Sequence, residues 1–221
     1  MKPNNILITV LLTITLAACS TPAVTTTSSN PAVEVTTTSS PFETSAPVVV
    51  TFTDPVLEAM IRGAMGKPEG EITFAEAQGV TRMDLTDSLQ RQLSEFTPIN
   101  NLDGLEAFTN LESLDLSQNA VSDISPLAGL TKLTALSLAG NPVTDVAPLA
   151  KLTNLKLLIL SNCQAQDYSA LSNLINLQVL WLDNSTISDV SSLASLTNLQ
   201  TLYLDKSTIE DFSSLENIYT T

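Results

Sequence analysis

A period of 22 residues runs through the second half of this 221-residue chain and constrains its fold more than any other feature. Each of five consecutive units opens with the pattern Leu-x-x-Leu-x-Leu. The leucines of these openings are Leu111, Leu114 and Leu116; Leu133, Leu136 and Leu138; Leu155, Leu158 and Leu160; Leu177, Leu180 and Leu182; and Leu199, Leu202 and Leu204. A pattern that recurs in phase five times predicts a stack of equivalent coils that bury one another's leucines.

The alternation within each opening predicts a short β-strand. Apolar residues at every second position give a strand one buried face, and the rest of the unit returns the chain so that the next strand can pair beside it. One unit alone buries little apolar surface, so we expect the strands to stack in parallel at about 4.8 Å per repeat. The unit length and its opening are the signature of leucine-rich repeats.

A row of residues just after the strands is expected to fasten the turns. Asn119 and Asn141 stand where the strand leaves the sheet, and a buried amide there can bond backbone groups of its own and neighbouring turns. Cys163 follows in the same row. We expect it to be a small buried residue without a reactive role.

Aspartate forms a second row with the same spacing. Its members are Asp123, Asp145, Asp167, Asp189 and Asp211. A line of calcium ligands along one edge is one interpretation. Capping is favoured, because the first two members precede Pro126 and Pro148, and proline is tolerated early in a helical turn whose free N–H groups a carboxylate can accept.

The unit from Leu111 to Leu130 resembles the internalin-like class of bacterial leucine-rich repeats, whose 22-residue unit ends in a DIxPLxxLT segment. The residues that carry the resemblance are Asn119, Val121, Asp123, Ile124, Pro126 and Leu127, and it extends roughly over residues 52–219. It implies an α/β solenoid: a right-handed leucine-rich repeat with a parallel concave β-sheet, short 3₁₀ or irregular convex segments and a small helical N-terminal cap. It also implies a bacterial surface protein that binds a ligand on the concave sheet, without saying which. The later units depart from this pattern, because Ala170, Ser192 and Ser214 replace the proline and the asparagine is lost.

Residues 52–85 are expected to cap the first leucines. Asp54 and Pro55 begin a helical pattern that Gly66 ends, and Thr73 with Glu76 forms a capping-box pattern for a second short helix. A first, degenerate strand follows within 80–85. Residues 86–110 are expected to form an irregular unit before the five regular repeats at 111–219.

The amino terminus predicts export and lipid anchoring. Residues 1–18 have the charge and apolar run of a secretory signal that is too short to span a membrane permanently. The run Leu16-Ala17-Ala18-Cys19 resembles the lipobox of bacterial lipoproteins, which implies cleavage before Cys19 and acylation of its thiol. An ordinary secretory signal with an incidental cysteine is the alternative. Residues 19–51, rich in Ser, Thr and Pro, are expected to be a disordered linker that holds the domain away from the membrane.

Composition excludes several classes of function. A net charge of −14 disfavours nucleic acid, whose binding depends on Lys and Arg at the phosphates. The chain has no histidine, which removes His-dependent triads and imidazole metal sites. With Cys19 lipidated and Cys163 in the solenoid, no intramolecular disulfide is expected. We expect no cofactor and no metal.

The residues between the leucines point outward from the sheet and should determine what the solenoid binds. Along the central column the sequence changes from Asp84, Asp115 and Ser137 to Ile159, Trp181 and Tyr203. We predict an exposed ligand-binding patch composed of Leu157, Ile159, Val179, Trp181 and Tyr203, with Asp183, Asp205, Lys156 and Lys206 at its rim. Exposed apolar patches mark interaction sites, and Trp and Tyr are frequent hot spots. The alternative is that these residues pack on one another without a ligand.

Three classes of function can be compared on this basis. The leading hypothesis is a surface-displayed module that recognises a protein or a glycan through the patch. The alternative is an envelope protein that assembles through an uncapped C-terminal end. An enzyme is not expected: Asp183 and Asp205 could imitate the paired carboxylates of a glycosidase, but an open sheet offers no deep pocket to raise the pKa of one of them.

Overall fold

The computed structural model describes residues 47–86, 97–187 and 189–209. The expected signal segment 1–18, the expected lipidation site Cys19 and the linker up to residue 46 lie outside this range. Residues 87–96 of the irregular unit, Asp211 and the rest of the fifth repeat lie outside it as well.

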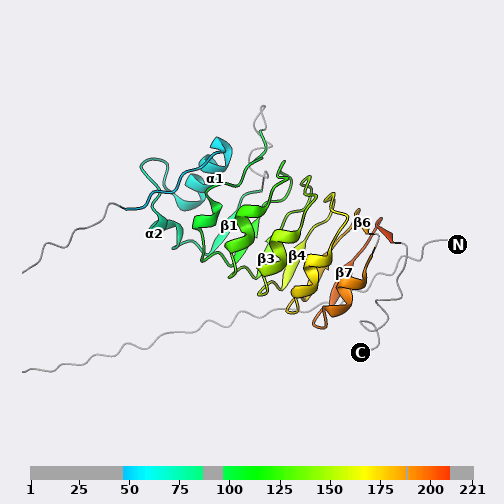
Figure 1. Ribbon diagram of the computed structural model, residues 1–221. Coiled ribbons are helices and arrows are strands. Elements are labelled where there is room, and N and C mark those ends of the chain that lie inside the picture. The colour runs from blue at the N-terminus through cyan, green and yellow to red at the C-terminus, as the bar shows by residue number, and fades with distance from the viewer. Residues whose placement is uncertain (1–46, 87–96, 188, 210–221) are drawn as a thin grey trace, which may run out of the picture. The chain divides into compact units, whose positions relative to one another are not determined.

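Six short parallel strands form one sheet, and their order in space follows their order in the sequence (Figure 1). They are β1 (Arg82–Asp84), β2 (Ser113–Asp115), β3 (Ala135–Ser137), β4 (Leu157–Ile159), β5 (Val179–Trp181) and β7 (Thr201–Tyr203). From β2 onward each strand pairs with the residues 22 positions later, as Ser113 does with Ala135. The first pair, Arg82 with Ser113, is separated by more than 22 residues, because the irregular unit lies between the two strands. The expected leucine-rich repeat solenoid is confirmed.

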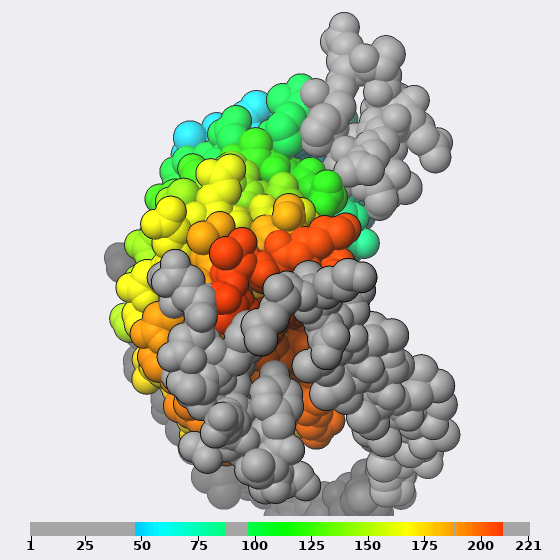
Figure 2. Space-filling model, turned by 90° about the vertical axis from the view of Figure 1, so that its right-hand side faces the viewer, coloured from blue at the N-terminus to red at the C-terminus, as the bar shows by residue number. Residues whose placement is uncertain are grey.

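The return segments contain short 3₁₀ helices, which form a second row beside the sheet (Figure 1). They span Leu105–Ala107, Ser125–Gly129, Ala147–Lys151, Ser169–Asn173 and Ser191–Ser195. Between this row and the sheet, the opening leucines of the first four regular units are buried in one continuous core. Seen end-on, the described coils follow one behind another from the red C-terminal coils to the cyan cap (Figure 2).

The four described members of the aspartate row bond the start of the last four of these 3₁₀ helices. Each carboxylate accepts a hydrogen bond from the backbone N–H two residues later, which belongs to the first residue of the helix. The distances are 2.8 Å from Ser125 to Asp123, 2.8 Å from Ala147 to Asp145, 2.8 Å from Ser169 to Asp167 and 2.7 Å from Ser191 to Asp189. The bonds from Ser125 and Ser169 hold the pKa of Asp123 and of Asp167 below its ordinary value. The predicted capping role is confirmed.

The asparagine row joins adjacent coils inside the protein. The Asn141 side-chain oxygen accepts the Val121 N–H at 3.0 Å, and its nitrogen donates to the carbonyls of Leu116 and Leu138, both at 2.9 Å. Asn119 accepts the Ile99 N–H in the same way. The predicted role of this row is confirmed, because a single amide satisfies groups that belong to two coils.

The N-terminal cap contains α1 (Pro55–Met65) and α2 (Phe74–Ala77). Buried Asp54 caps α1 and also accepts the N–H groups of Asn100 and Asn101, which fastens the cap to the chain that leads into the repeats. Thr73 and Glu76 form the predicted capping box at α2.

The cap begins earlier than the sequence predicts. Residues 19–51 are expected to form a linker, but Val49 pairs antiparallel with Thr73, and the Val50 N–H donates to the Ile72 carbonyl at 2.8 Å. The physical reason is the run of three valines, whose β-branched side chains favour an extended strand.

The last described coils carry an element that the period does not predict. Strands β6 (Thr186–Ile187) and β8 (Thr208–Ile209) pair in parallel as a separate two-stranded sheet just after β5 and β7. In the final coil Leu199, Leu202 and Leu204 are half-buried, whereas their counterparts in the preceding coils are fully buried. In the described parts of the chain, no helix has the length and apolar composition needed to cross a membrane.

Candidate functional site

The predicted patch residues lie together on the last three strands of the main sheet. Ile159, Trp181 and Tyr203 are partners in register across β4, β5 and β7 and form the central column. Leu157 and Val179 are partners in the column beside it, which continues to Thr201. Because neighbouring parallel strands are about 4.8 Å apart, these side chains form one continuous surface.

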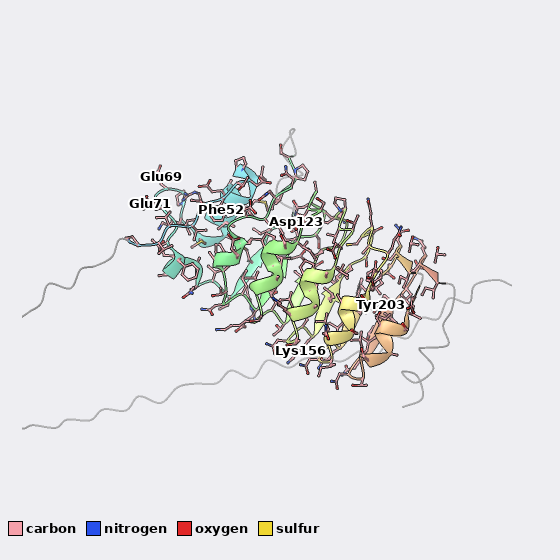
Figure 3. The ribbon with its side chains drawn as sticks, viewed as in Figure 1. Phe52, Glu69, Glu71, Asp123, Lys156 and Tyr203 are labelled. Atoms are coloured by element: carbon pink, nitrogen blue, oxygen red, sulfur yellow. The ribbon has the colours of Figure 1, made fainter. Side chains whose placement is uncertain are left out.

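Trp181 and Tyr203 contact each other directly. Their ring centroids are 4.4 Å apart and their planes are inclined by 48°. Figure 3 labels Tyr203 on the last coils of the solenoid. An aromatic pair at this distance contributes about 1 kcal/mol beyond its buried area, so the two rings hold each other in a fixed orientation on the face.

The patch is less exposed than the sequence predicts. Leu157, Ile159, Val179, Trp181 and Tyr203 are all half-buried. The exposure is partial because neighbours in register cover part of each side chain, as the contact between the two aromatic rings shows. The indole N–H of Trp181 is buried and has no hydrogen-bond partner.

The rim of the patch is polar, and one of its carboxylates is held in place. Asp183 accepts the hydroxyl of Ser161 at 3.2 Å and the backbone N–H of Asp205 at 2.8 Å. Asp205 is exposed and lies 3.8 Å from the Lys206 ammonium. Lys156 is exposed before β4. The rim therefore presents one oriented carboxylate, that of Asp183, and several exposed charges beside apolar surface.

The first strands of the same face have a different character. On β1 and β2 the carboxylates of Asp84 and Asp115 accept hydrogen bonds from Thr86 and Ser117, and the Ser117 hydroxyl lies 2.6 Å from that of Ser137. These side chains satisfy one another within the protein. The sheet thus changes from a self-satisfied polar surface to an apolar one along its length.

The acidic side chains and Cys163 are spread over the described residues. No group of three or more Cys, Asp or Glu side chains in the described ranges is placed to hold a metal ion. Burial raises the pKa of Cys163 to about 11, and its thiol donates to the Leu138 carbonyl at 3.5 Å. Cys163 is thus the small buried residue that the sequence predicts, and its thiol stays protonated at neutral pH.

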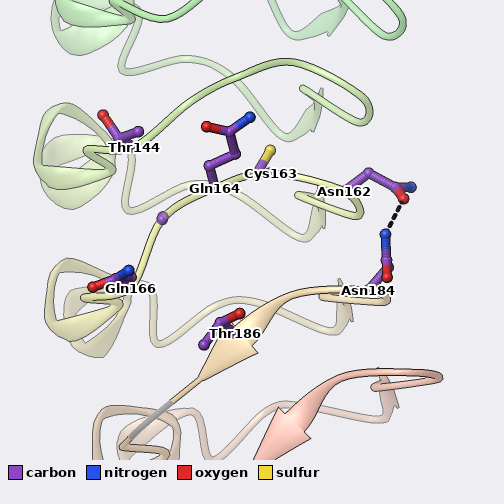
Figure 4. Close-up of a pocket in the computed structure, with 8 residues that line it drawn as sticks. Thr144, Asn162, Cys163, Gln164, Gln166, Asn184 and Thr186 are labelled. Carbon is purple, nitrogen blue, oxygen red and sulfur yellow. Dashed lines mark hydrogen bonds between the residues drawn. The ribbon is translucent and has the colours of Figure 1, made fainter.

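One feature of the edge of the solenoid is missed by sequence reasoning. A hollow of about 570 Å³ lies beside the segments that follow strands β4 and β5. It is located between residues 162–166 of one coil and residues 184–186 of the next (Figure 4). The signal that could have found it is the coincidence of Cys163 and Ala165, which break two rows of the repeat in the same coil.

Comparison with known proteins agrees with the fold. The sequence matches a family described as leucine-rich repeats, in two copies, over residues 131–173 and 175–217. A solved internalin from Listeria monocytogenes is 29% identical with a TM-score of 0.60, and the match covers 80% of this chain and 57% of that one. The chain therefore spans little more than half of that internalin's length. A search of curated proteins finds no match.

Two further solved structures are similar to this chain. An internalin C2 from Listeria monocytogenes is 28% identical with a TM-score of 0.41, over 76% of this chain and 90% of that one. A leucine-rich repeat protein from Leptospira interrogans is 24% identical with a TM-score of 0.53, over 61% of this chain and 33% of that one. The second of these supports the fold alone.

Proposed function

We propose that this chain, an internalin-like leucine-rich repeat protein of bacterial type, binds a protein ligand through the outward face of β4, β5 and β7. The observation that carries the proposal is the contact between Trp181 and Tyr203, which places two aromatic rings together at the apolar end of the sheet face. Trp and Tyr are the side chains most enriched among interface hot spots.

The surroundings of the two rings favour a protein over a small molecule. Leu157, Ile159 and Val179 extend the surface across three strands, and hot spots typically lie in an apolar centre surrounded by a polar rim. Asp183 and Asp205 provide carboxylates at that rim. Lys156 and Lys206 lie at the same rim, so a partner with charges of both signs around an apolar anchor fits this arrangement.

Substitution of the two aromatic residues tests the proposal. Affinity capture from the extracellular proteins that the bacterium meets would use the full chain and its Trp181→Ala variant as baits, and the affinity of each protein retained by the wild type would then be measured. Trp181→Ala or Tyr203→Ala should weaken binding by about 2 kcal/mol or more, while the protein stays folded and its melting temperature falls by only a few degrees through loss of the ring contact.

The matched control is Phe74→Ala, which removes an aromatic side chain that is 37% exposed on the cap. This variant should bind as the wild type does. Equal binding by Trp181→Ala would reject the site, and a large fall in the melting temperature of that variant would identify Trp181 as a core residue.

We also propose that the protein is held at an extracytoplasmic membrane surface by lipid on Cys19. The lipobox-like run before this residue supports the proposal, and two or more acyl chains would provide stable anchoring. Cys19→Ser should move the protein from the membrane to the soluble fraction. Cys163→Ser is the control and should stay with the membrane; retention of Cys19→Ser would reject lipidation.

Association through the last coil is a second candidate function. It is favoured by the half-buried leucines of that coil, Leu199, Leu202 and Leu204. A second chain that covers them would bury apolar surface worth about 25 cal/mol per Å². Sedimentation of the full chain should then show oligomers that grow with concentration and that Leu202→Glu disrupts, whereas a monomer at every concentration would reject this function.

A further inference from the structure

The hollow at the edge of the solenoid has a structural cause in one coil. At the position of Ala165 the other described coils carry Val121, Val143, Ile187 and Ile209, so this coil has the smallest side chain of the row. Ala165 and Cys163 line the hollow between the two coils. Neither the thiol of Cys163 nor the hydroxyl of Ser185 can replace the asparagine amide that links the earlier coils, so the edge is open here.

Every side chain around this opening that can form a hydrogen bond with a ligand is neutral. Besides Cys163 and Ala165, the lining consists of Thr144, Asn162, Gln164, Gln166, Asn184 and Thr186. All six are exposed. They come from three successive coils and surround a space with no charged group, although the chain carries 23 acidic residues. A lining of this kind is suited to an uncharged polar ligand.

Four of the lining side chains end in amides, and they form two pairs with different surroundings. Asn162 and Asn184 are joined, since the Asn184 amide donates to the Asn162 side-chain oxygen at 2.7 Å (Figure 4). Gln164 and Gln166 are both exposed and line the opening, so their side-chain amides can reach a bound ligand. Each amide combines donors with an acceptor, which is what a hydroxyl group requires because it both donates and accepts.

The interior behind the opening also has unused hydrogen-bonding capacity. The hydroxyls of Ser185 and Tyr168 are buried, with 4% and 2% of their residue surfaces exposed, and they lie near each other without forming a hydrogen bond of good geometry. Ser185 lies between Asn184 and Thr186, which both line the hollow. Unsatisfied buried hydroxyls are costly and are commonly satisfied by an ordered water or a ligand group.

We propose that this hollow binds a neutral, hydroxyl-rich ligand, a short segment of carbohydrate, with Gln164, Gln166 and Thr186 as its principal contacts. About 570 Å³ lies within the usual range of small-ligand sites, which is 300 to 1,000 Å³. The site is separate from the face proposed to bind protein, because none of its lining residues lies on β4, β5 or β7; Thr186 lies on β6. One coil can therefore present a protein surface and a sugar site at the same time.

Nuclear magnetic resonance of the full chain, labelled with ¹⁵N, tests this proposal. The probes are neutral trisaccharides of glucose, mannose and N-acetylglucosamine, each added to about 10 mM, a concentration that reveals dissociation constants of a few millimolar. At least one trisaccharide should shift the side-chain amide signals of Gln164 and Gln166 in a saturable manner. The double variant Gln164→Ala/Gln166→Ala should reduce the affinity at least tenfold.

The control variant is Gln200→Ala, which removes an exposed glutamine of another coil and should leave the titration unchanged. An uncharged Gly/Ser heptapeptide serves as a probe of a different class. Absence of saturable shifts with all three sugars would overturn the proposal, as would equal affinity in the double variant. Saturable binding of the peptide without binding of any sugar would overturn the assignment to carbohydrate.

Discussion

The coils that carry Asn119 and Asn141 differ from the three coils that follow in how they treat buried polar groups. In the earlier coils the asparagine amides bond backbone groups of two turns at once, and the polar side chains of the sheet face bond one another. The later coils have Cys163, Ser185 and Ser207 in that row. All four buried side-chain atoms that lack a hydrogen-bond partner in the described structure belong to these later coils: they are in Tyr168, Trp181, Ser185 and Ser192.

The earlier and the later coils therefore differ in how many polar groups remain available for a ligand. The earlier coils have little left to offer a ligand, because their polar groups are already satisfied. The later coils carry both the aromatic face and the open edge. Both surfaces that we propose to bind ligands lie where the repeat has lost part of its internal hydrogen bonding, and each substitution below tests this relation.

The largest effect is expected from Asn141→Ala. It removes the partner of the Val121 N–H and of two buried carbonyls, and each unsatisfied buried group costs about 1 to 3 kcal/mol. The free energy of unfolding, measured by urea denaturation, should fall by about 3 kcal/mol or more. Asn154→Ala is the control, since this exposed asparagine makes one bond to the Thr131 carbonyl and should cost less than about 1 kcal/mol. Equal losses would contradict a special role for the buried row.

A smaller effect is expected from Asp54→Asn in the N-terminal cap. The change tests how much the buried carboxylate of Asp54 contributes to stability. Burial would raise the pKa of Asp54, but hydrogen bonds from four backbone N–H groups outweigh it and lower the pKa. A lowered pKa in the folded state means that stabilisation is complete above the ordinary carboxyl pKa and is lost as the pH falls through the lowered value. Asp54→Asn should cost about 2 kcal/mol at pH 7.

The difference in the free energy of unfolding between Asp54→Asn and the wild type should become smaller as the pH falls below about 4. Urea denaturation at a series of pH values measures it. Glu69→Gln, an exposed carboxylate of the cap, serves as the control and should cost little at any pH. A cost for Asp54→Asn that stays constant down to pH 2 would show that its charge does not matter.

A gain in stability is expected from Cys163→Asn, which restores the row in the first later coil. The new amide can accept the Val143 N–H and donate to the Leu138 and Leu160 carbonyls, as Asn141 does one coil earlier. Unfolding should become harder by about 1 kcal/mol, and hydrogen exchange at the Val143 amide should slow. Cys163→Ser, which is of similar size but has no amide, should give neither change. Unchanged hydrogen exchange at Val143 in Cys163→Asn would show that loss of the asparagine does not explain the difference between the earlier and the later coils.

The smallest effect concerns a backbone position that follows each strand. Gln118, Asn162, Asn184 and Lys206 all have a positive φ there, and Gly140 occupies the same row. Lys206→Gly should stabilise the last described coil by about 0.5 kcal/mol, because glycine adopts this conformation without steric cost. Asn184→Gly should gain less, since asparagine tolerates it well. Thermal unfolding compares the two, and a loss of stability in Lys206→Gly would contradict the argument.

The regular features of this molecule could be predicted because each depends on one residue type at one spacing. The leucine period predicts the sheet and its register, and the asparagine and aspartate rows predict the bonds that these side chains make. The capping box at Thr73 and Glu76 is predicted for the same reason, since its partners are three residues apart.

The remaining features could not be predicted because they depend on distant or missing neighbours. Val49 belongs to the cap through its pairing with Thr73, a partner far along the chain that a local pattern does not reveal. The partial burial of the aromatic face results from the packing of one ring on another. The hollow results from small residues in one coil, which is visible only against the other coils of the stack.

The constant step of 22 residues between paired strands gives the molecule an adjustable reach. Duplication or deletion of one complete coil in the regular part would leave every local contact type in place and move the aromatic face by about 4.8 Å relative to the cap. The height at which the protein presents this face can therefore change in equal increments without any change in the face itself. The number of coils in such a solenoid thus sets the distance between its cap and its aromatic face.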